Sequence, residues 1–495
     1  MRSCNNRSVL EVRKVLVAKQ VREKLCATFL LFACGVILEV FMDKDYRYKI
    51  SAHNDALADS PAGRPSFFVR TYGCQMNSRD SEKLSALLIQ LGYTAANSQE
   101  EADFVLYNTC CVRESAEDRI FGNLGRLKRA KQDKRNLFIA VCGCMAQQPE
   151  IAEKIKQSHR YINLVFGTHN RHRLPELLWQ AIETGKQVID INEDEGLPEL
   201  EDVPATTREF AHKAGVNIMY GCDNFCSYCI VPYVRGREKS RPAADVLHEV
   251  AELAHDGVKE IMLLGQNVNS YEFGFAQLLR DVAKVEGIQR IRFMTSHPKD
   301  FSDELVQAVA DIPQICKSIH LPIQSGSTRI LQDMNRMYTQ ADYLELIQKL
   351  RAAVPDIAIS TDIIVGYPGE TEDDFLATLD VVRKVRFATA FTFIYSKRSG
   401  TPAAQRTDIV QPKIASERYD RLVADVSPIL LEINEAKIGH TFDTMVEDIT
   451  ADGYKGRTDD HSLVHFTSAA ALVPGDIVSV EITHARTYYI SGRCT

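Results

Sequence analysis

The 495-residue sequence lacks an excess of positive charge, and it lacks an apolar run long enough to cross a membrane. Its 59 Lys and Arg against 66 Asp and Glu give a net charge of −7, which by itself does not indicate a nucleic-acid-binding protein. Local basic patches matter more than this sum, so RNA binding is not excluded. The apolar run 26–40 is shorter than the ~20 residues that a transmembrane helix needs. We therefore expect a protein that does not bind membranes.

The 13 cysteines do not form a pattern typical of a disulfide-stabilised protein. The count is odd, which argues against complete pairing, and the chain lacks the short, cysteine-dense form of a secreted module. Several cysteines instead lie in closely spaced groups, which suits metal binding in a reducing compartment. We expect a cytoplasmic, monomeric protein.

Residues 1–65 are expected to be an extension that is not part of the catalytic fold. The first 25 positions are rich in Arg and Lys, and the apolar run that follows has no good signal-peptide cleavage site after it. Met42 is a candidate start of translation. A membrane anchor is the alternative interpretation of this segment.

The rest of the chain alternates between strand and helix patterns and predicts a multidomain α/β protein. Residues 66–185 predict an N-terminal domain with a parallel sheet covered by helices. An acidic linker that contains proline spans 186–207. Residues 208–437 hold six strand–helix units, fewer than a closed barrel needs, and predict a partial (β/α)6 barrel. The short β segments of 438–495 predict a small β-barrel.

One group of cysteines has the spacing CxxxCxxC and comprises Cys222, Cys226 and Cys229. It follows a predicted strand and lies at the carboxyl end, where barrel enzymes hold their reactive groups. A structural zinc ion needs a fourth ligand, and no nearby Cys or His supplies one. A four-iron cluster held by three cysteines keeps one iron open to bind a small molecule. We therefore expect a 4Fe-4S cluster here, with zinc or a redox cysteine group as the alternative.

A second group combines cysteines that are far apart in the sequence. Cys74, Cys110 and Cys144 each follow one of three predicted parallel strands. The carboxyl ends of such strands share one edge of the sheet, so the three side chains are expected to converge there. Any one of them is equally well explained as a buried apolar residue. Cys111 and Cys142 compete for the same roles, and spacing leaves the choice open, because 142 and 144 share a strand face.

Several segments resemble the radical SAM methylthiotransferase family, in which SAM is S-adenosylmethionine. The resemblance runs from about residue 67 to the end of the chain. It is carried by Thr71–Asn77, Asn108–Glu114, Gly143–Gln147, Gly221–Glu238, His320–Ser327 and Met334–Tyr338.

The resemblance implies a domain of this family at 66–185, a radical SAM domain at 208–437 and a TRAM-like barrel at 438–495. It implies two 4Fe-4S clusters as well as SAM. By this resemblance Cys74, Cys110 and Cys144 hold an auxiliary cluster, and the CxxxCxxC group holds the cluster that binds SAM. No catalytic side chain is assigned beyond these cysteines.

The motifs most resemble the branch of the family that modifies an isopentenylated adenosine at position 37 of tRNA, in the anticodon loop. The resemblance implies that one SAM donates a methyl group toward sulfur held at the auxiliary cluster. Reductive cleavage of a second SAM gives a radical that removes hydrogen from carbon 2 of the adenine, and the methylthio group joins that carbon. The implied partners are this tRNA and an electron donor such as flavodoxin or ferredoxin. The resemblance names no sulfur donor.

Other functions compete with this one. Further branches of the family modify a threonylcarbamoyl adenosine or an aspartate of a ribosomal protein, and Asn224–Phe225 and Val231–Tyr233 argue against the latter. The chain is alternatively an iron–sulfur or zinc RNA-binding protein without catalysis. A binding module, however, has no need of an open iron.

Polar or glycine-rich residues follow the other predicted barrel strands. We expect contacts to SAM from Gln266, Asn267, Ser296, Gln324 and Gly366, because this edge is where a barrel site lies. Gly366 has no side chain, which would let its backbone approach the adenine of SAM closely. A turn or a helix cap is the simpler explanation for each.

Basic residues accompany both cysteine groups. Arg126, Lys128 and Arg129 lie in a predicted helix, and Arg235 and Arg237 follow the CxxxCxxC group. We expect these five side chains to contact tRNA phosphates. A solvated helix face explains the first three equally well.

Overall fold

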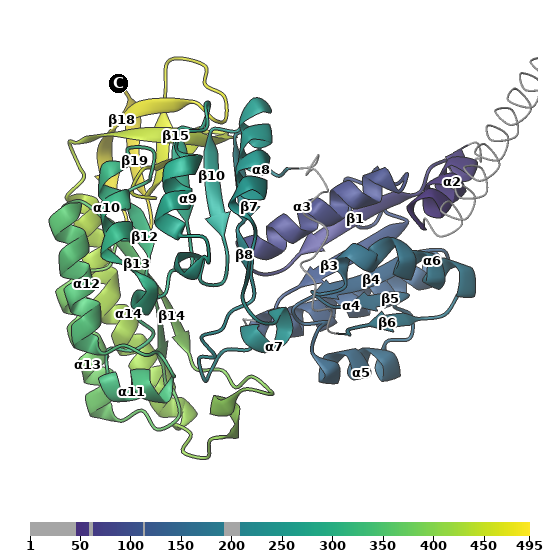
Figure 1. The fold of residues 1–495 in the computed structure, drawn as a ribbon, viewed down its shortest axis with the longest axis horizontal. Helices are drawn as coiled ribbons and strands as arrows, with labels where there is room; N and C mark the ends of the chain where they lie inside the picture. Colours follow the sequence, from purple (N-terminus) through teal and green to yellow (C-terminus); the bar gives the residue numbers. More distant parts are fainter. Residues whose placement is uncertain (1–45, 59–62, 112–113, 193–207) are drawn as a thin grey trace, which may run out of the picture.

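The computed structural model describes residues 46–58, 63–111, 114–192 and 208–495, with the side chains of 114–118 left out of the description. The chain forms an N-terminal α/β domain, a central half-barrel of parallel strands and a small C-terminal barrel (Figure 1). This architecture confirms the fold class that the sequence predicts. Most of the predicted acidic linker, residues 193–207, lies outside the described residues.

The N-terminal domain is built on a parallel sheet of six strands in the order β2-β1-β3-β4-β5-β6. The strands are β1 (Ser66–Thr71), β2 (Thr94–Ala95), β3 (Phe104–Thr109), β4 (Phe138–Gly143), β5 (Leu164–Phe166) and β6 (Val188–Asp190). All six residues of β3 are buried, which is typical of a central parallel strand covered on both faces.

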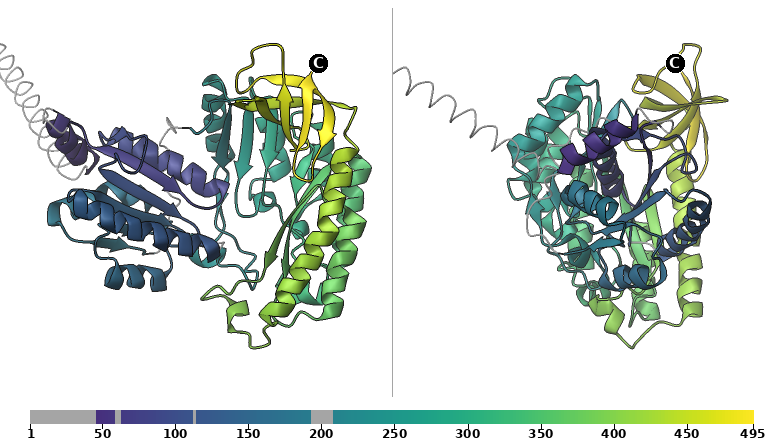
Figure 2. Two further views of the ribbon diagram at one scale, coloured as in Figure 1. Left: turned by 180° about the vertical axis from the view of Figure 1, so that it is seen from behind. Right: turned by 90° about the vertical axis from the view of Figure 1, so that its right-hand side faces the viewer.

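Helices cover both faces of this sheet, and each face has its own hydrophobic core (Figure 2). Helices α3 (Gln75–Gln90) and α6 (Leu174–Thr184) bury their leucines on one face. Helices α4 (Glu114–Asp133) and α5 (Pro149–Ser158) cover the other face. The carboxyl edge of the sheet is therefore left for the loops that carry cysteines.

The expected extension is not wholly outside the fold. Residues 46–58 form helix α2 (Tyr46–Ala58), which packs against α6. Ile50 is fully buried in the core of the α3 face, and the Asn54 amide donates to the carbonyl of Leu91 over 2.8 Å. The expectation was wrong for this segment, because α2 is weakly amphipathic and gives little periodic signal. Residues 1–45 lie outside the described residues.

The central domain has six parallel strands in two groups, β11-β10-β7 and β12-β13-β14. The strands are β7 (Lys213–Asn217), β10 (Glu260–Leu264), β11 (Arg290–Phe293), β12 (Ser318–His320), β13 (Ala358–Val365) and β14 (Thr389–Ile394). A bridge between Ile291 and Ile315 joins the groups. Among the described strands β7 and β14 do not pair, so the barrel is open on one side, as the sequence predicts.

The outer face of the half-barrel is covered by helices that contribute to one large core. These helices are α8 (Ala243–His255), α9 (Phe275–Val282), α10 (Asp303–Asp311), α12 (Gln340–Ala353), α13 (Glu372–Val385) and α14 (Pro412–Glu435). Two shorter helices, α7 (Val231–Arg235) and α11 (Thr328–Asp333), lie at the carboxyl edge of the strands. A short antiparallel pair, β8 (Met219–Tyr220) and β9 (Lys239–Ser240), flanks the loop with the three close cysteines.

The C-terminal domain is a closed barrel in the order β15-β16-β17-β19-β18. Its strands are β15 (Thr441–Thr450), β16 (Gly453–Thr458), β17 (Leu463–Thr467), β18 (Ile477–Ala485) and β19 (Ile490–Cys494). Arg290 and Arg292, at the start of β11, donate hydrogen bonds of 2.8 to 3.0 Å to its backbone carbonyls. The barrel therefore sits at the amino ends of the half-barrel strands. No helix in the described parts of the chain has the length and apolar character to span a bilayer.

Candidate active site at two cysteine trios

The carboxyl edge of the N-terminal sheet brings together Cys74, Cys110 and Cys144. Cys74 caps the start of α3 directly after β1, Cys110 follows β3, and Cys144 follows β4. The three are placed closely: the amide of Cys144 donates to the carbonyl of Thr109 over 3.0 Å. Gly73 has a φ of 123°, and a Cβ there would lie 2.4 Å from the Cβ of Cys110. Only glycine lets the loop before Cys74 approach Cys110 this closely.

Cys142 belongs to the sheet core and not to this trio. It is fully buried on the α3 face, among Leu84, Leu106 and Phe166. Cys144 lies with the core of the opposite face, so the expectation that the two share a face was wrong. The reason is Gly143, whose φ of 94° turns the chain at the end of β4.

Cys111 lies behind the trio and contacts it. It is buried in the core of the α4 face, whereas Cys110 is in neither core of this domain. The Cys111 thiol hydrogen-bonds to Cys144 and, together with the guanidinium of Arg235, lowers the pKa of Cys144 to about 6, although burial acts in the opposite direction. Both cysteines are buried, but Cys110 lies against Gly73, the neighbour of Cys74, so packing favours Cys110 over Cys111 as a member of the trio.

Arg235 is a buried member of this site and not a surface cation. Its guanidinium donates to Cys144 Sγ over 3.2 Å, to Asn77 Oδ1 over 2.6 Å and to the carboxylate of Asp80 over 3.0 Å. Asp80 is also paired with Arg171. The exposed fraction of Arg235 is only 7%, and its guanidinium is directed at protein acceptors, so the burial contradicts the expected contact of Arg235 with tRNA phosphates.

The second trio lies on the loop between β8 and α7. Cys222 and Cys226 are buried, and Cys229 is partly exposed. Burial raises the pKa of Cys222 to about 11, which favours the neutral thiol until a metal displaces the proton. Phe225, in the middle of this loop, has a φ of 44°, a left-handed conformation that aromatic residues rarely adopt.

The two trios are neighbours. Helix α7 begins two residues after Cys229 and ends at Arg235, which reaches Cys144. Ile230 and Val234, at the start and end of this helix, pack in the same core cluster as Cys144. A single turn of helix therefore joins the two cysteine trios.

The arrangement of the cysteines fits a cluster better than a single ion. Within the described ranges, no three His, Cys, Asp or Glu side chains converge as ligands of one metal ion. A cubic iron–sulfur cluster makes no such demand, because each cysteine binds a different iron atom and the sulfurs stay apart. Thiolates are the ligands that such clusters take, normally four in number, so each trio would hold a cluster with one iron left open.

Buried polar atoms without a partner mark the carboxyl ends of β10 and β11. They are Gln266 Oε1, Asn267 Oδ1, Ser296 Oγ and His297 Nε2. Buried polar groups normally have partners, so this concentration indicates a place for a polar ligand. His297 was not among the residues expected to contact SAM, although it lies beside Ser296. Burial, helped by Arg336 and Lys299, lowers its pKa to about 2, so its imidazole is neutral.

The two other residues expected to contact SAM, Gln324 and Gly366, both have a left-handed backbone conformation. Gln324 is buried at the end of β12 with a φ of 69°. Gly366 has a φ of 72°, but a Cβ there would lie 2.7 Å from the Cβ of Ala415 in α14. The missing side chain of Gly366 makes room for a helix, which is a second reason for glycine here, and the close approach of its backbone to SAM stays a prediction.

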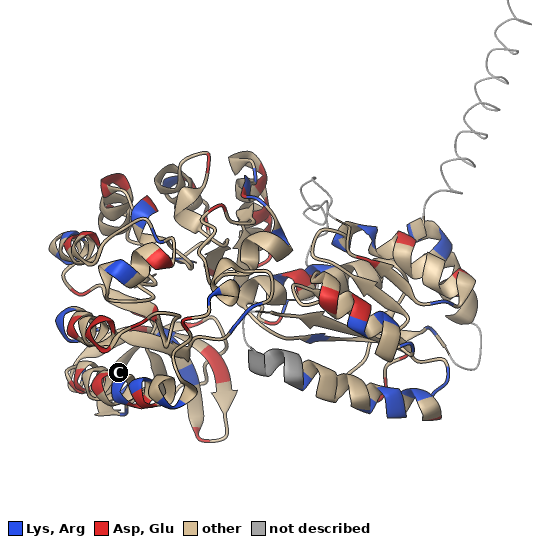
Figure 3. Ribbon diagram, turned by 90° about the horizontal axis from the view of Figure 1, so that it is seen from below, with Lys and Arg blue, Asp and Glu red and all other residues tan. Residues whose placement is uncertain are grey.

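The other basic residues are exposed. Arg126, Lys128 and Arg129 lie on the outer face of α4, where basic side chains gather (Figure 3). Arg237 is 69% exposed; it pairs with Asp223 over 3.1 Å and lies over the ring of Phe225. All four remain available to a polyanion.

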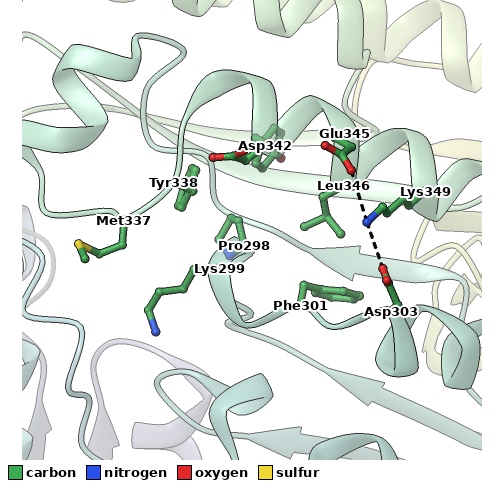
Figure 4. A pocket seen from close by; sticks show the side chains of 11 residues that line it. Pro298, Lys299, Phe301, Asp303, Met337, Tyr338, Asp342, Glu345, Leu346 and Lys349 are labelled. Atoms are coloured by element: carbon green, nitrogen blue, oxygen red, sulfur yellow. Dashed lines mark hydrogen bonds and ion pairs between the residues drawn. The ribbon is translucent and has the colours of Figure 1, made fainter.

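A further pocket has a volume of about 340 Å³ (Figure 4). It lies between the segment from Pro298 and α12, and its lining carries charges of both signs, such as Lys299, Asp342 and Glu345. No cysteine lines it, so we place the candidate site at the trios and not in this pocket.

Comparisons with known proteins agree with this location. Residues 216–382 match the radical SAM superfamily, and residues 66–167 match a family described as uncharacterized protein family UPF0004.

Curated relatives cover most of the chain. A protein of Acetivibrio thermocellus named tRNA-2-methylthio-N(6)-dimethylallyladenosine synthase is 49% identical over 86% of this chain and 90% of its own length. Its namesake in Clostridioides difficile is 45% identical over 92% of this chain and 97% of its own length.

Among solved structures, the radical S-adenosylmethionine methyltransferase TsrM of Kitasatospora setae aligns with a TM-score of 0.50. It is 14% identical and covers 69% of this chain and 74% of its own, which shows likeness of fold alone.

Proposed function

This chain belongs to the radical SAM methylthiotransferase family of its curated relatives, and we propose that it methylthiolates carbon 2 of an isopentenylated adenosine in tRNA. One observation carries the proposal. Two cysteine trios, one from each α/β domain, lie next to each other at the carboxyl ends of the strands of the two domains. A protein that only binds RNA has no use for two such sites joined by one helical turn.

The two trios have different roles in this proposal. Cys222, Cys226 and Cys229 hold a 4Fe-4S cluster with one open iron for SAM, and Cys74, Cys110 and Cys144 hold the auxiliary 4Fe-4S cluster. Bound together with SAM, these groups supply one-electron chemistry that no side chain can provide. The chain's own part is to bind them, to orient the adenine between them and to exclude water.

The unpartnered buried atoms of Gln266, Asn267 and Ser296 support a SAM site at the carboxyl ends of β10 and β11. SAM offers both donors and acceptors, and the carbonyl oxygens of Gln266 and Asn267 accept hydrogen bonds from an amino group. The neutral His297 contributes a fourth polar atom without adding charge. Gln324 and Gly366, which follow β12 and β13, belong to the same proposed site.

The tRNA would approach along the exposed basic residues. Four basic side chains are exposed: Arg126, Lys128, Arg129 and Arg237. Exposed cations bind phosphates with an affinity that falls as the salt concentration rises. The electron donor, which we expect to be a flavodoxin or a ferredoxin, and the monomeric, cytoplasmic state stay predictions.

The test is an assay of the full chain purified without oxygen. The protein is reconstituted with iron and sulfide and given SAM, dithionite and isopentenylated tRNA, and the digested nucleosides are analysed by mass spectrometry. We expect a mass gain of one methylthio group on the modified adenosine, and none in Cys222→Ala or Cys74→Ala. Cys316→Ala is the matched control, because Cys316 is also buried but lies outside both trios.

Two results would contradict parts of the proposal. Formation of 5′-deoxyadenosine without change to the nucleoside would support the radical chemistry. It would contradict the assignment of tRNA as the substrate. Absence of both products in protein with full iron content would favour the iron–sulfur RNA-binding protein.

A further inference from the structure

The turn after α11 is packed against the loop of the second trio. The backbone N–H of Ser227 donates to the carbonyl of Met334 over 3.0 Å, and its hydroxyl donates to that of Asp333 over 2.8 Å. The side-chain amide of Asn335 donates to the carbonyl of Asn224 over 2.9 Å. Three consecutive residues, 333 to 335, thus bind Ser227 and Asn224 of the cysteine loop, which fixes the two segments relative to each other.

The backbone of this turn is strained in a way that directs one side chain inward. Asn335 and Met337 have φ values of 59° and 54°, in the left-handed region that residues other than glycine rarely adopt. Arg336 lies between them and is 4% exposed, while Met337 is 73% exposed. Strain of this kind persists only where surrounding contacts impose it, and it concentrates at functional sites.

The guanidinium of Arg336 has three partners. Its Nε donates to the hydroxyl of Tyr338 over 3.0 Å, and one terminal nitrogen donates to the carbonyl of Pro322 over 2.8 Å. The other terminal nitrogen lies 3.6 Å from the sulfur of Cys226. Two fixed oxygens therefore aim the third arm of the guanidinium at a cysteine of the CxxxCxxC group.

The buried charge of Arg336 has an unusual set of neighbours. In the part of the chain that the structure describes, no Asp or Glu lies within ion-pair distance of Arg336, and its neighbours are phenols, a carbonyl and Cys226. An unpaired charge inside a protein is costly, so buried cations have an anion beside them. When a cluster is bound through Cys226, the ligand sulfur that Arg336 contacts at 3.6 Å would supply this negative charge. By contrast, Arg235 at the other trio is paired with Asp80.

We propose that Arg336 is the counter-ion of the cluster held by Cys222, Cys226 and Cys229, and that it raises the reduction potential of this cluster through its hydrogen bond to Cys226. The inference rests on the proposed function, which places a cluster there. Reduction adds one electron from an external donor and makes the cluster more negative. A fixed cation beside a ligand sulfur stabilises the reduced form more than the oxidised form. Arg336 is thus a positioning residue that makes the cluster easier to reduce.

The test uses full-length protein that carries only this cluster, made by changing Cys74, Cys110 and Cys144 to Ala. In this parent, Arg336→Gln and Arg336→Lys are compared by redox titration followed by electron paramagnetic resonance, in the absence of SAM. We expect Arg336→Gln to shift the midpoint potential to a more negative value and Arg336→Lys to stay near the parent. Arg351→Gln is the matched control, because Arg351 is a half-buried arginine that donates to the carbonyl of Val385, away from the cysteines.

A second measurement does not depend on the potential. Without the cluster, Arg336 is a buried cation that has no Asp or Glu beside it among the described residues, so cluster reconstitution should raise the melting temperature of the parent more than that of Arg336→Gln. Equal potentials in the parent and Arg336→Gln, or equal shifts in the Gln and Lys variants, would overturn the inference. A shift that requires added SAM would also overturn it, since Arg336 would then pair with the carboxylate of SAM. A parent that takes up no iron would instead refute the proposed function, and the inference with it.

Discussion

The guanidinium of Arg235 donates a 3.2 Å hydrogen bond to the sulfur of Cys144, across the boundary between the two α/β domains. Arg235 is the last residue of α7, which starts just after Cys229. The relative position of the two trios therefore depends on a contact that neither domain makes alone. It also places a positive charge beside a thiol that is otherwise buried, with consequences for the chemistry of that thiol.

The pH dependence of Cys144 in the iron-free protein should reflect this contact. The pKa of Cys144 is lowered from 9.0 to about 6, first by the hydrogen bond with Cys111 and then by Arg235. The thiolate is then populated above about pH 6 and lost as the pH falls below it. Labelling of Cys144 by iodoacetamide, followed by mass spectrometry of the peptides, should show a midpoint there. Arg235→Gln should move the midpoint upward, and the exposed Arg237→Gln should not; an unchanged profile in Arg235→Gln would contradict the assignment.

Cys142 and Cys144, two residues apart, should differ in their effect on iron content. Cys144→Ala should remove the auxiliary cluster, about half of the iron of the reconstituted protein if each cluster holds four atoms. Cys142→Ala should leave the iron content unchanged and reduce stability by only about 1 kcal/mol, since it deletes a small buried group. Iron and sulfide analysis of both variants distinguishes them. Equal iron loss would mean that Cys142 takes part in the cluster site.

Helix α2 should contribute to the stability of the N-terminal domain. Ile50→Ala should lower the free energy of unfolding by about 2–5 kcal/mol, because it leaves a cavity in a closed core. Tyr48, two residues earlier on the same helix, is 53% exposed, and Tyr48→Ala should cost about 0.5 kcal/mol or less. Urea denaturation of the two variants makes the comparison. Similar small effects would place this helix outside the cooperative fold.

Removal of the Arg292 side chain should weaken the attachment of the C-terminal barrel to the half-barrel. Arg292 donates to Glu260 over 3.0 Å and to the carbonyls of Thr458 and Asp459, and both members of this ion pair are buried. Arg292→Ala leaves Glu260 uncompensated, so we expect a loss of about 3–5 kcal/mol.

Faster proteolysis of Arg292→Ala between the half-barrel and β15 would accompany this loss. The control is Arg280→Ala, which breaks a surface pair with Glu304 and should cost about 1 kcal/mol or less. If both variants resist protease like the parent, the barrel is held by other contacts.

The regular elements follow from local patterns. The six strand–helix units predicted in 208–437 correspond to the six parallel strands of the half-barrel, and the β segments predicted in 438–495 form the closed barrel. Alternation of strands with helices also places Cys74, Cys110 and Cys144 at the ends of parallel strands. These features depend on residues close together in the chain, which is why periodicity predicts them.

The chemistry of single side chains depended on contacts that no local pattern contains. The side of the sheet that Cys144 takes is set by the left-handed turn at Gly143, and the burial of Arg235 is set by Asp80, 155 positions earlier. A basic residue after a cysteine motif has the same sequence signal whether it faces solvent or a thiolate. By itself, the sequence therefore determined the alternation of strands and helices from residue 66 onward and the cysteines that follow the strands, and it left open the choice between Cys110 and Cys111 and between Cys142 and Cys144. Only the tertiary structure decided which cations stand beside sulfur and which remain free for a polyanion, because burial results from the packing of distant segments.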